Sequence, residues 1–206
     1  MSNLKIKVCG MREPENIQDL ALLDIDFMGF IFYAPSKRFT AELPTAAIPS
    51  RIKKTGVFVN ATQAYIQAKI DDGLQAIQLH GDEPAALCAS LKKDNDIPLI
   101  KAFGVDESMD WSKLNPYEGH VDYFLFDTKS AAYGGLGKAF DWEVLKGYAL
   151  PTPYFLSGGL SLENLDTALH IEDPRLIGLD LNSQFEDQPA LKNIDNIKQA
   201  LKIIKA

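Results

Sequence analysis

Near the start of the chain, residues 4–24 read LKIKVCGMREPENIQDLALLD and join two patterns. The first part, LKIKVCG, is an apolar run with β-branched residues, which is typical of a strand. The second part, PENIQDLALLD, begins with a proline, the residue preferred in a first helical turn, and spaces Ile17, Leu20 and Leu23 on one face. The stretch therefore predicts a strand followed by a helix, the repeating unit of parallel sheets.

Similar apolar runs, rich in β-branched and aromatic residues, recur along the whole chain, at 27–33, 55–60, 76–81, 98–104, 121–128, 153–159 and 176–182. Several alternate little between apolar and polar residues, which suits parallel strands covered on both faces. Helical patterns lie between most of the runs, at 62–72, 83–93, 161–170 and 190–204. The regular alternation predicts βαβ units throughout.

Eight such units predict an α/β fold, a (β/α)8 TIM barrel formed by one domain over residues 1–206. An open doubly wound sheet is the alternative, but it usually shows G-x-G-x-x-G after its first strand, where this chain reads CGMREP. Two units are the weakest, because Pro49 interrupts the segment at 42–52 and the segment at 107–117 is short.

The helix starts can also be predicted. Thr62 is expected to cap the helix after the third strand, whose Ala64, Ala68 and Ile70 lie on or near one face. Ser161 is expected to begin the helix after the seventh strand. Asp141, followed by Trp142, is expected to begin the sixth helix.

Composition narrows the class of protein. The 206 residues are 46% hydrophobic and 24% charged, which is typical of a globular domain and too apolar for disorder. The net charge of −7 argues against a nucleic-acid-binding surface. The two cysteines are far apart and suggest no disulfide framework, and no secretory or membrane-spanning pattern is recognisable. We expect a cytoplasmic protein without a membrane partner.

In a barrel of this kind the active site lies at the carboxyl ends of the strands. The polar residues expected at that face are Cys9, Ser36, Lys37, Arg38, Asn60, His80, Asp127, Thr128, Ser157, Gly158, Gly159, Asp180, Asn182 and Ser183. Gly158 and Gly159 precede a helix, so their backbone N–H groups could approach an anion there. Ser183 could add a donor, and loops after the last two strands commonly bind phosphate in such barrels. A phosphorylated small molecule is the ligand that this pattern favours.

Each of the other polar residues has a structural and a functional interpretation. Cys9 can be an inert buried thiol or a thiol at a site. Asp127 can cap a turn or act on a ligand, and the Gly-rich segment after it, KSAAYGGLGKAFDW, could close over a ligand. Arg38 can be a solvated charge or can bind a carboxylate, and His80 can be structural or can contact ligand.

Metal chemistry finds no support in the sequence, because the three histidines and two cysteines show no ligand spacing. Lys101 is a lysine within a strand that could suggest a Schiff base, but no second feature supports that interpretation. No metal is expected.

Taken in order, the strand-end motifs resemble the phosphoribosylanthranilate isomerase family of tryptophan biosynthesis. The matching stretches are KVCGM at 7–11, DFMGFIFYAPSKR at 26–38, GVFVN at 56–60, IQLHGDEP at 77–84, FDTKSAAYGGLGKAFDW at 126–142, LSGGLSLEN at 156–164 and GLDLNSQFED at 178–187. The resemblance implies a single-domain (β/α)8 barrel without cofactor. It also implies an Amadori rearrangement of N-(5-phosphoribosyl)anthranilate to 1-(2-carboxyphenylamino)-1-deoxyribulose 5-phosphate.

The resemblance also implies residue roles. Asp127 matches the general acid, Cys9 the general base, and Arg38 the group that holds the anthranilate carboxylate. Segments around Gly158-Gly159 and Asn182-Ser183 match the phosphate site, while Asp180 and His80 match positions near the substrate. These roles need an Asp127 that is protonated near neutral pH and a Cys9 that is partly ionised.

The chain departs from the family pattern after the eighth strand, where Gln184 replaces a glycine, so the phosphate contacts there are the least secure part of the resemblance. Two alternatives stay open. One is another phosphosugar barrel such as indoleglycerol-phosphate synthase, which would favour an essential lysine and glutamate. The other is a barrel that binds a phosphorylated ligand without catalysis. The protein is expected to be a monomer or a homodimer.

Overall fold

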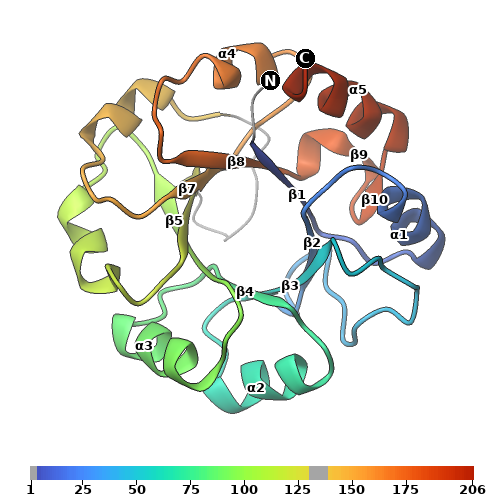
Figure 1. Ribbon diagram of the computed structural model, residues 1–206, viewed down its shortest axis with the longest axis horizontal. Helices are drawn as coiled ribbons and strands as arrows, with labels where there is room; N and C mark the ends of the chain where they lie inside the picture. The colour runs from blue at the N-terminus through green and yellow to red at the C-terminus, as the bar shows by residue number, and fades with distance from the viewer. Residues whose placement is uncertain (1–3, 130–138) are drawn as a thin grey trace.

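The computed structural model describes residues 4–129 and 139–206, and it shows a closed barrel of eight parallel strands. The strands are β1 (Lys5–Cys9), β2 (Phe27–Ile31), β3 (Lys53–Phe58), β4 (Ala76–Leu79), β5 (Leu99–Val105), β6 (Tyr123–Thr128), β7 (Tyr154–Leu156) and β8 (Leu176–Leu181). Figure 1 looks along the barrel, with the strands as an inner ring and the helices outside it. The prediction of a (β/α)8 barrel is confirmed.

Closure joins the two ends of the described chain, because β1 pairs with β8 as well as with β2. The register places Lys7 opposite Asp180 on one side and Cys9 opposite Gly29 on the other. Residues far apart in sequence therefore share one wall of the barrel.

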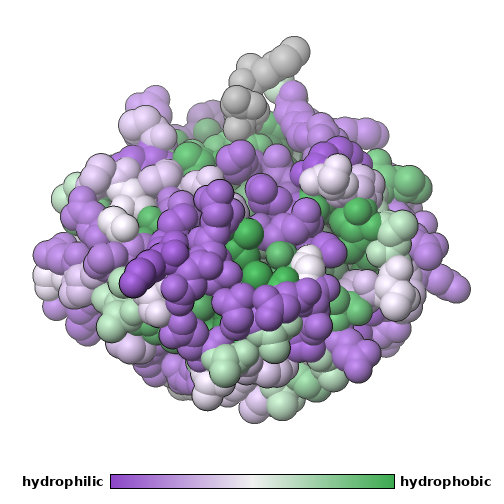
Figure 2. Space-filling model, turned by 60° about the horizontal axis from the view of Figure 1, so that its bottom comes forward, coloured by the Kyte–Doolittle hydropathy of each residue, from purple (hydrophilic) through white to green (hydrophobic). Residues whose placement is uncertain are grey.

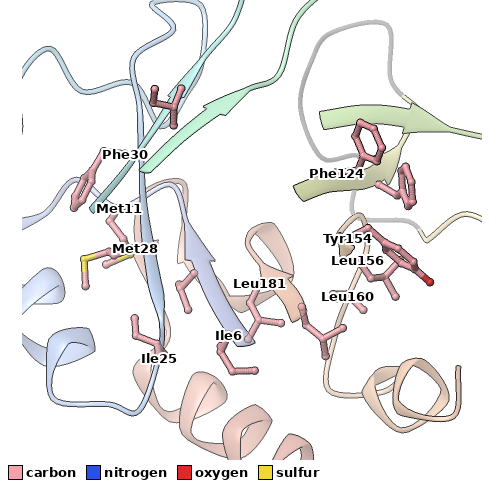
Figure 3. Close-up of a cluster of buried hydrophobic side chains, with 14 of the residues drawn as sticks. Ile6, Met11, Ile25, Met28, Phe30, Phe124, Tyr154, Leu156, Leu160 and Leu181 are labelled. Atoms are coloured by element: carbon pink, nitrogen blue, oxygen red, sulfur yellow. The ribbon is translucent and has the colours of Figure 1, made fainter. Parts of the chain in front are cut away.

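Two hydrophobic clusters lie on opposite sides of the barrel strands, one between the strands and the helices and the other inside the barrel. Side chains such as Phe124 and Phe126 pack outward into the large cluster beneath the helices, whereas Leu125 packs inward against Phe27 and Phe155. Figure 3 shows part of the outer cluster, where residues from β1, β2 and β8 meet in one group and residues from β6 and β7 in another. Side chains alternate along a strand, so every second residue points into the barrel. Nearer the carboxyl ends of the strands than the inner cluster, these inward positions hold polar residues.

The covering elements are more irregular than the strands. They comprise the helices α1 (Pro14–Ala21), α2 (Gln63–Asp71), α3 (Ala85–Asp94), α4 (Leu165–Leu169) and α5 (Ile194–Ile204), the 3-10 helices η1 (Trp111–Tyr117), η2 (Trp142–Gly147) and η3 (Ser183–Phe185), and a small hairpin of β9 (Glu186–Gln188) and β10 (Leu191–Lys192). In the described part of the chain, no helix is long and apolar enough to cross a membrane.

Several helix predictions hold. Pro14 is the first residue of α1, with Ile17 and Leu20 buried beneath it. The Thr62 hydroxyl caps α2 by accepting a hydrogen bond from the Tyr65 N–H at 3.2 Å. The Asp141 carboxylate accepts from the Glu143 N–H at 3.0 Å and begins η2, although this element is a 3-10 helix.

Other helix predictions are wrong. The segment at 42–52 forms turns between β2 and β3 because its prolines remove backbone donors, and residues 111–117 form only a 3-10 helix. In α2, Ala64 and Ala68 are exposed and Ile66 is the buried residue.

The two helices near the end of the chain start later than predicted. α4 begins at Leu165 instead of Ser161, because the Asn164 side chain binds the Ser161 N–H in a turn. The last helix begins at Ile194 instead of 190, because the residues before it belong to the β9–β10 hairpin.

Candidate active site

A pocket lies at the carboxyl ends of the strands, where the inward polar residues converge. Its wall consists of Cys9, Ile31, Tyr33, Ser36, Arg38, Val57, Val59, Gln78, His80, Asp127, Ser157, Asp180 and Asn182. The pocket holds only about 50 Å³, but it shares His80 and Asp127 with a cavity of about 590 Å³ that extends over β5 toward η1. Since ligand sites usually enclose roughly 300–1,000 Å³, a ligand would occupy both spaces.

This pocket, and not a larger cavity outside the barrel, holds the candidate residues. A cavity of about 1010 Å³ lies between η2 and α4, outside the barrel, and its wall contains none of them. The small pocket instead brings together eight residues that the sequence placed at this face: Cys9, Ser36, Arg38, His80, Asp127, Ser157, Asp180 and Asn182. Chemistry, rather than size, therefore identifies the candidate site.

Cys9 ends β1 with its side chain inside the barrel, 3% exposed. Its sulfur lies over Gly29 of the neighbouring strand, where a Cβ atom would come within 2.7 Å of Sγ. Burial raises the pKa of the Cys9 thiol, and the charge of Asp180 adds to the rise, while the charges of Lys7 and Lys192 oppose it. Burial therefore opposes the partly ionised state that the role of Cys9 requires, and the neighbouring cations favour it.

Lys7 lies beneath Cys9 and is completely buried, although the sequence had not marked it as a site residue. Its ammonium group donates a hydrogen bond to Asp180 Oδ2 at 2.8 Å. Burial raises the pKa of Asp180, an effect that Lys7 opposes and that the charge of Asp127 strengthens. The sequence did contain a signal for this residue. Lys7 lies two positions before Cys9 in the strand LKIKVCG, so both side chains must project from the same face.

Asp127 lies across the pocket from Cys9 at the end of β6, 9% exposed. Its Oδ1 accepts a hydrogen bond from the Thr128 N–H at 2.8 Å, and its Oδ2 is 3.4 Å from His80 Nε2. His80 is in turn oriented by Gln78, whose amide Nε2 is 2.8 Å from Nδ1. If this amide donates, the imidazole carries its proton on Nε2, facing Asp127.

Arg38 reaches the pocket from the segment after β2 and is held there by an acidic partner. Its Nε and Nη2 donate to the Glu186 carboxylate at 2.7–3.0 Å. Burial tends to raise the pKa of Glu186, but the hydrogen bonds from Arg38 and the charge of Lys192 outweigh it and lower the pKa. The Nη1 side of the guanidinium plane faces away from this carboxylate and is the part suited to a ligand.

Lys192 completes this cluster from below. It is buried, donates to Asn182 Oδ1 at 2.8 Å, and pairs with Glu186. Burial lowers the pKa of Lys192 to about 8. Glu186 and Lys192 belong to the unpredicted β9–β10 hairpin; Glu186 lies within the matching stretch GLDLNSQFED, but no local pattern marked either residue as part of the site.

The predicted phosphate residues are only partly brought together. Gly158 and Gly159 form a turn with φ of 81° and 67°, conformations that glycine adopts without strain. A helix does not follow directly, because α4 starts at Leu165, which is a correction to the expected glycine–helix junction. Gly158, Gly159 and Ser183 do not line the pocket in the described structure, whereas Asn182 does.

Two other predictions can be placed. Lys101 is buried, donates to the Gly81 carbonyl at 2.7 Å and pairs with Glu83 at 3.1 Å, so its observed role is to hold the turn that carries His80.

Most of the Gly-rich segment expected to close over a ligand, residues 130–138, lies outside the described residues. Within the described residues, no group of three or more His, Cys, Asp or Glu side chains could hold a metal ion.

A parallel eight-stranded barrel with a buried thiol, a carboxyl group and a guanidinium at its carboxyl-terminal mouth defines a (β/α)8-barrel enzyme. The model of the N-(5'-phosphoribosyl)anthranilate (PRA) isomerase family matches residues 6–203. The chain belongs to this family, and it is an isomerase of tryptophan biosynthesis.

Individual relatives agree with this assignment. An N-(5'-phosphoribosyl)anthranilate isomerase of Parabacteroides distasonis is 48% identical over 205 residues, which are 97% of this chain and 92% of the relative. The crystal structure of phosphoribosyl anthranilate isomerase from Thermotoga maritima is 32% identical, with a TM-score of 0.81 over 98% of both chains. A phosphoribosyl anthranilate isomerase in complex with reduced 1-(o-carboxyphenylamino)-1-deoxyribulose 5-phosphate is 30% identical, with a TM-score of 0.79 and the same coverage.

Proposed function

We propose that the protein converts N-(5-phosphoribosyl)anthranilate into 1-(2-carboxyphenylamino)-1-deoxyribulose 5-phosphate by an Amadori rearrangement with general acid/base catalysis. The observation that carries the proposal is the single pocket into which a buried thiol, Cys9, and a buried carboxyl group, Asp127, both point. An acid and a base on opposite sides of one substrate are what this rearrangement requires.

In the first step, Asp127 donates its proton to the ribose ring oxygen. The C1′–O bond breaks, and the nitrogen lone pair forms a protonated Schiff base. In the second step, Cys9 as a thiolate removes the proton on C2′. The C–H electron pair forms the C1′–C2′ double bond, the C=N electrons return to nitrogen, and the resulting enolamine tautomerises to the ketone. His80 contacts Asp127 from β4 and is suited to orient its carboxyl group.

The charged groups of the ligand have separate partners in this proposal. Arg38 binds the anthranilate carboxylate through its Nη1 side, while Glu186 holds the rest of the guanidinium. Asp180 has a buried Oδ1 without a hydrogen-bond partner among the described residues, and this oxygen is suited to accept from a sugar hydroxyl group. Gly158, Gly159, Asn182 and Ser183 form the phosphate end. We also propose a cytoplasmic enzyme that acts without a metal, a cofactor or nucleic acid.

The test is the loss of fluorescence of freshly prepared phosphoribosylanthranilate when the purified protein is added. Turnover by the wild type supports the isomerase, and its absence sinks the proposal in favour of another phosphosugar barrel or a binding protein. Cys9→Ser and Asp127→Asn should each lower kcat by about 10²–10⁴, the range of general acid–base catalysis. Cys88→Ser, which removes the other thiol in the chain, should leave kcat near the wild-type value.

The proposed role of Arg38 predicts a different kinetic signature. Because its contact with the carboxylate is made in the ground state as well as in the transition state, Arg38→Met should mainly raise KM. An unchanged KM would contradict the carboxylate role while leaving the acid and base assignments in place.

A further inference from the structure

Lys7 is a fully buried cation that the proposed chemistry has not used. Lysine is almost never completely buried unless it is paired, because removing its charge from water is expensive. Its side chain lies inside the barrel near an apolar layer that includes Phe27 and Phe155, and its ammonium group donates to Asp180 at 2.8 Å. Such a group needs an explanation beyond packing.

The barrel geometry aims Lys7 at Cys9. The two residues are two positions apart on β1, so their side chains project from the same face of the strand. The sulfur of Cys9 lies over Gly29 in β2, where a Cβ atom would come within 2.7 Å of it. Asp180 stands opposite Lys7 on β8 and binds its ammonium group, which interacts electrostatically with both the carboxylate and the thiol.

The charges around the thiol also favour a negative charge on the Cys9 sulfur. The groups that interact with Cys9 or with its neighbours are the cations Lys7, Lys192 and Arg38 and the carboxylates Asp180 and Glu186. Among these groups, three cations face two carboxylates. A thiolate at Cys9 would balance this buried cluster, whereas a neutral thiol leaves it with an excess positive charge.

We propose that Lys7 is a positioning residue whose ammonium group is the counter-ion of the Cys9 thiolate during proton abstraction, an inference that rests on the proposed function. The sulfur takes the C2′ proton, forms an S–H bond and loses its negative charge, while the substrate keeps the electron pair. Lys7 keeps its own proton throughout and makes or breaks no covalent bond.

The electrostatics of the two side chains support this role. Burial opposes the charge on Lys7, but Asp180 and Cys9 together outweigh burial and raise the pKa of Lys7, so it remains an ammonium group in the working range. The same positive charge opposes the rise that burial causes in the pKa of Cys9. Removing it should make the thiolate harder to form.

The experiment follows the alkylation of Cys9 by iodoacetamide as a function of pH, read by mass spectrometry without substrate. All variants carry Cys88→Ser, which removes the second thiol; burial raises the pKa of Cys88 to about 11 in any case. Lys7→Met should move the inflection of the profile upward by a pH unit or more, which is on the order of a tenfold slower reaction at pH 8. Lys7→Arg, which keeps the charge, should restore most of the rate.

A folded Lys7→Met protein, with a cooperative unfolding transition and an unchanged alkylation profile, would overturn the inference. If Lys7→Met does not fold, Lys7→Gln provides the second arm. Its neutral polar side chain removes the positive charge, so the inflection should again move to higher pH, and an inflection that stays or falls overturns the inference.

The readout separates this inference from the isomerase proposal. A shifted thiol profile in a protein that does not turn over phosphoribosylanthranilate would leave the Lys7–Cys9 pair intact and reject the function. Where turnover occurs, the acidic limb of kcat should move in Lys7→Met in the same direction as the alkylation profile.

Discussion

The thiol and the carboxyl group of the pocket each lie against a glycine. Gly29 makes room for the Cys9 sulfur, and Gly158 lies beside Asp127, where a Cβ atom would come within 2.7 Å of Oδ1. The φ of 81° at Gly158 also belongs to the region that disfavours other residues. At the scale of single residues, the position of the acid therefore depends on the absence of a neighbouring side chain.

Gly158→Ala tests this dependence, with Gly119→Ala as the matched control. Both glycines have a positive φ, but a Cβ atom at Gly119 would meet nothing within 4 Å. Gly119→Ala should therefore lose only the unfolding free energy that corresponds to backbone strain, about 1–2 kcal/mol. It should keep full activity. Gly158→Ala should lose more and should also lower kcat by at least about tenfold, because Asp127 must move.

Urea unfolding and steady-state kinetics measure the two effects. Equal losses of stability in the two variants, with an unchanged kcat for Gly158→Ala, would show that the pocket accommodates the extra carbon and that Gly158 does not position the acid.

The β9–β10 hairpin is the element that contributes most to the site beyond the eight βα units. It follows β8 and η3, and in Figure 1 it lies on the same side of the barrel as α1. It supplies Glu186 and Lys192, which hold Arg38 and Asn182. Its charged pairs are almost completely enclosed, since the Glu186 side chain is only 4% exposed and that of Lys192 is 0% exposed.

This enclosure predicts an acid dependence of stability. The pKa of Glu186 is lower in the folded protein than the roughly 4.3 of an unfolded chain. The contribution of its ionised carboxylate to the free energy of unfolding is therefore fully present above about pH 5. The contribution disappears as the pH falls through the folded pKa. At neutral pH, Glu186→Gln should lose about 3 kcal/mol of unfolding free energy, because the buried cations lose their partner.

Urea unfolding at a series of pH values between neutrality and pH 3 checks the sign. The difference between wild type and Glu186→Gln should shrink as the pH falls. The control is Glu143→Gln, whose ion pair with Lys146 is exposed and should leave the free energy of unfolding almost unchanged. A difference that stays constant with pH would contradict the assignment of the stability to the ionised carboxylate.

Among the elements, the strands were predictable and several helices were not. A strand covered on both faces must be apolar at nearly every position, so LIGLDLN and YFLFDT stand out in the sequence. The covering elements need only one apolar stripe, and a short 3-10 turn such as η1 or η2 can supply it. Whether a covering segment forms an α-helix, a 3-10 helix or turns therefore depends on its prolines and on its length. The periodicity of its apolar residues does not describe this choice.

At the scale of the whole molecule, few large hydrophobic side chains of the described residues are exposed. Figure 2 shows one face on which polar side chains predominate and apolar ones are visible mainly in the spaces between them. Among the described residues, the exposed large hydrophobic side chains are Leu22, which follows α1, and Tyr65 in α2. Single apolar residues of this kind do not make the contiguous patch of a stable subunit interface.

We therefore expect a monomer, the first of the two oligomeric states that the sequence left open. Sedimentation velocity at micromolar concentration should give a species of 22.8 kDa. A species of twice that mass would contradict the prediction, and if Leu22→Ser then restored the monomer, it would place the interface at the end of α1.

The sequence by itself determined the order of the strands, the barrel and the residues at the strand ends, because these follow from local periodicity and from the chain direction in parallel units. It thereby identified Cys9, Arg38, His80, Asp127, Asp180 and Asn182 as residues that could share one pocket. Only the tertiary structure decided their partners. Lys7 and Asp180 are 173 positions apart, and Arg38 and Glu186 are 148 apart, so these contacts exist only once the barrel closes. The pKa of the thiol is likewise raised by burial and shifted by charges brought from distant segments, which no local pattern encodes.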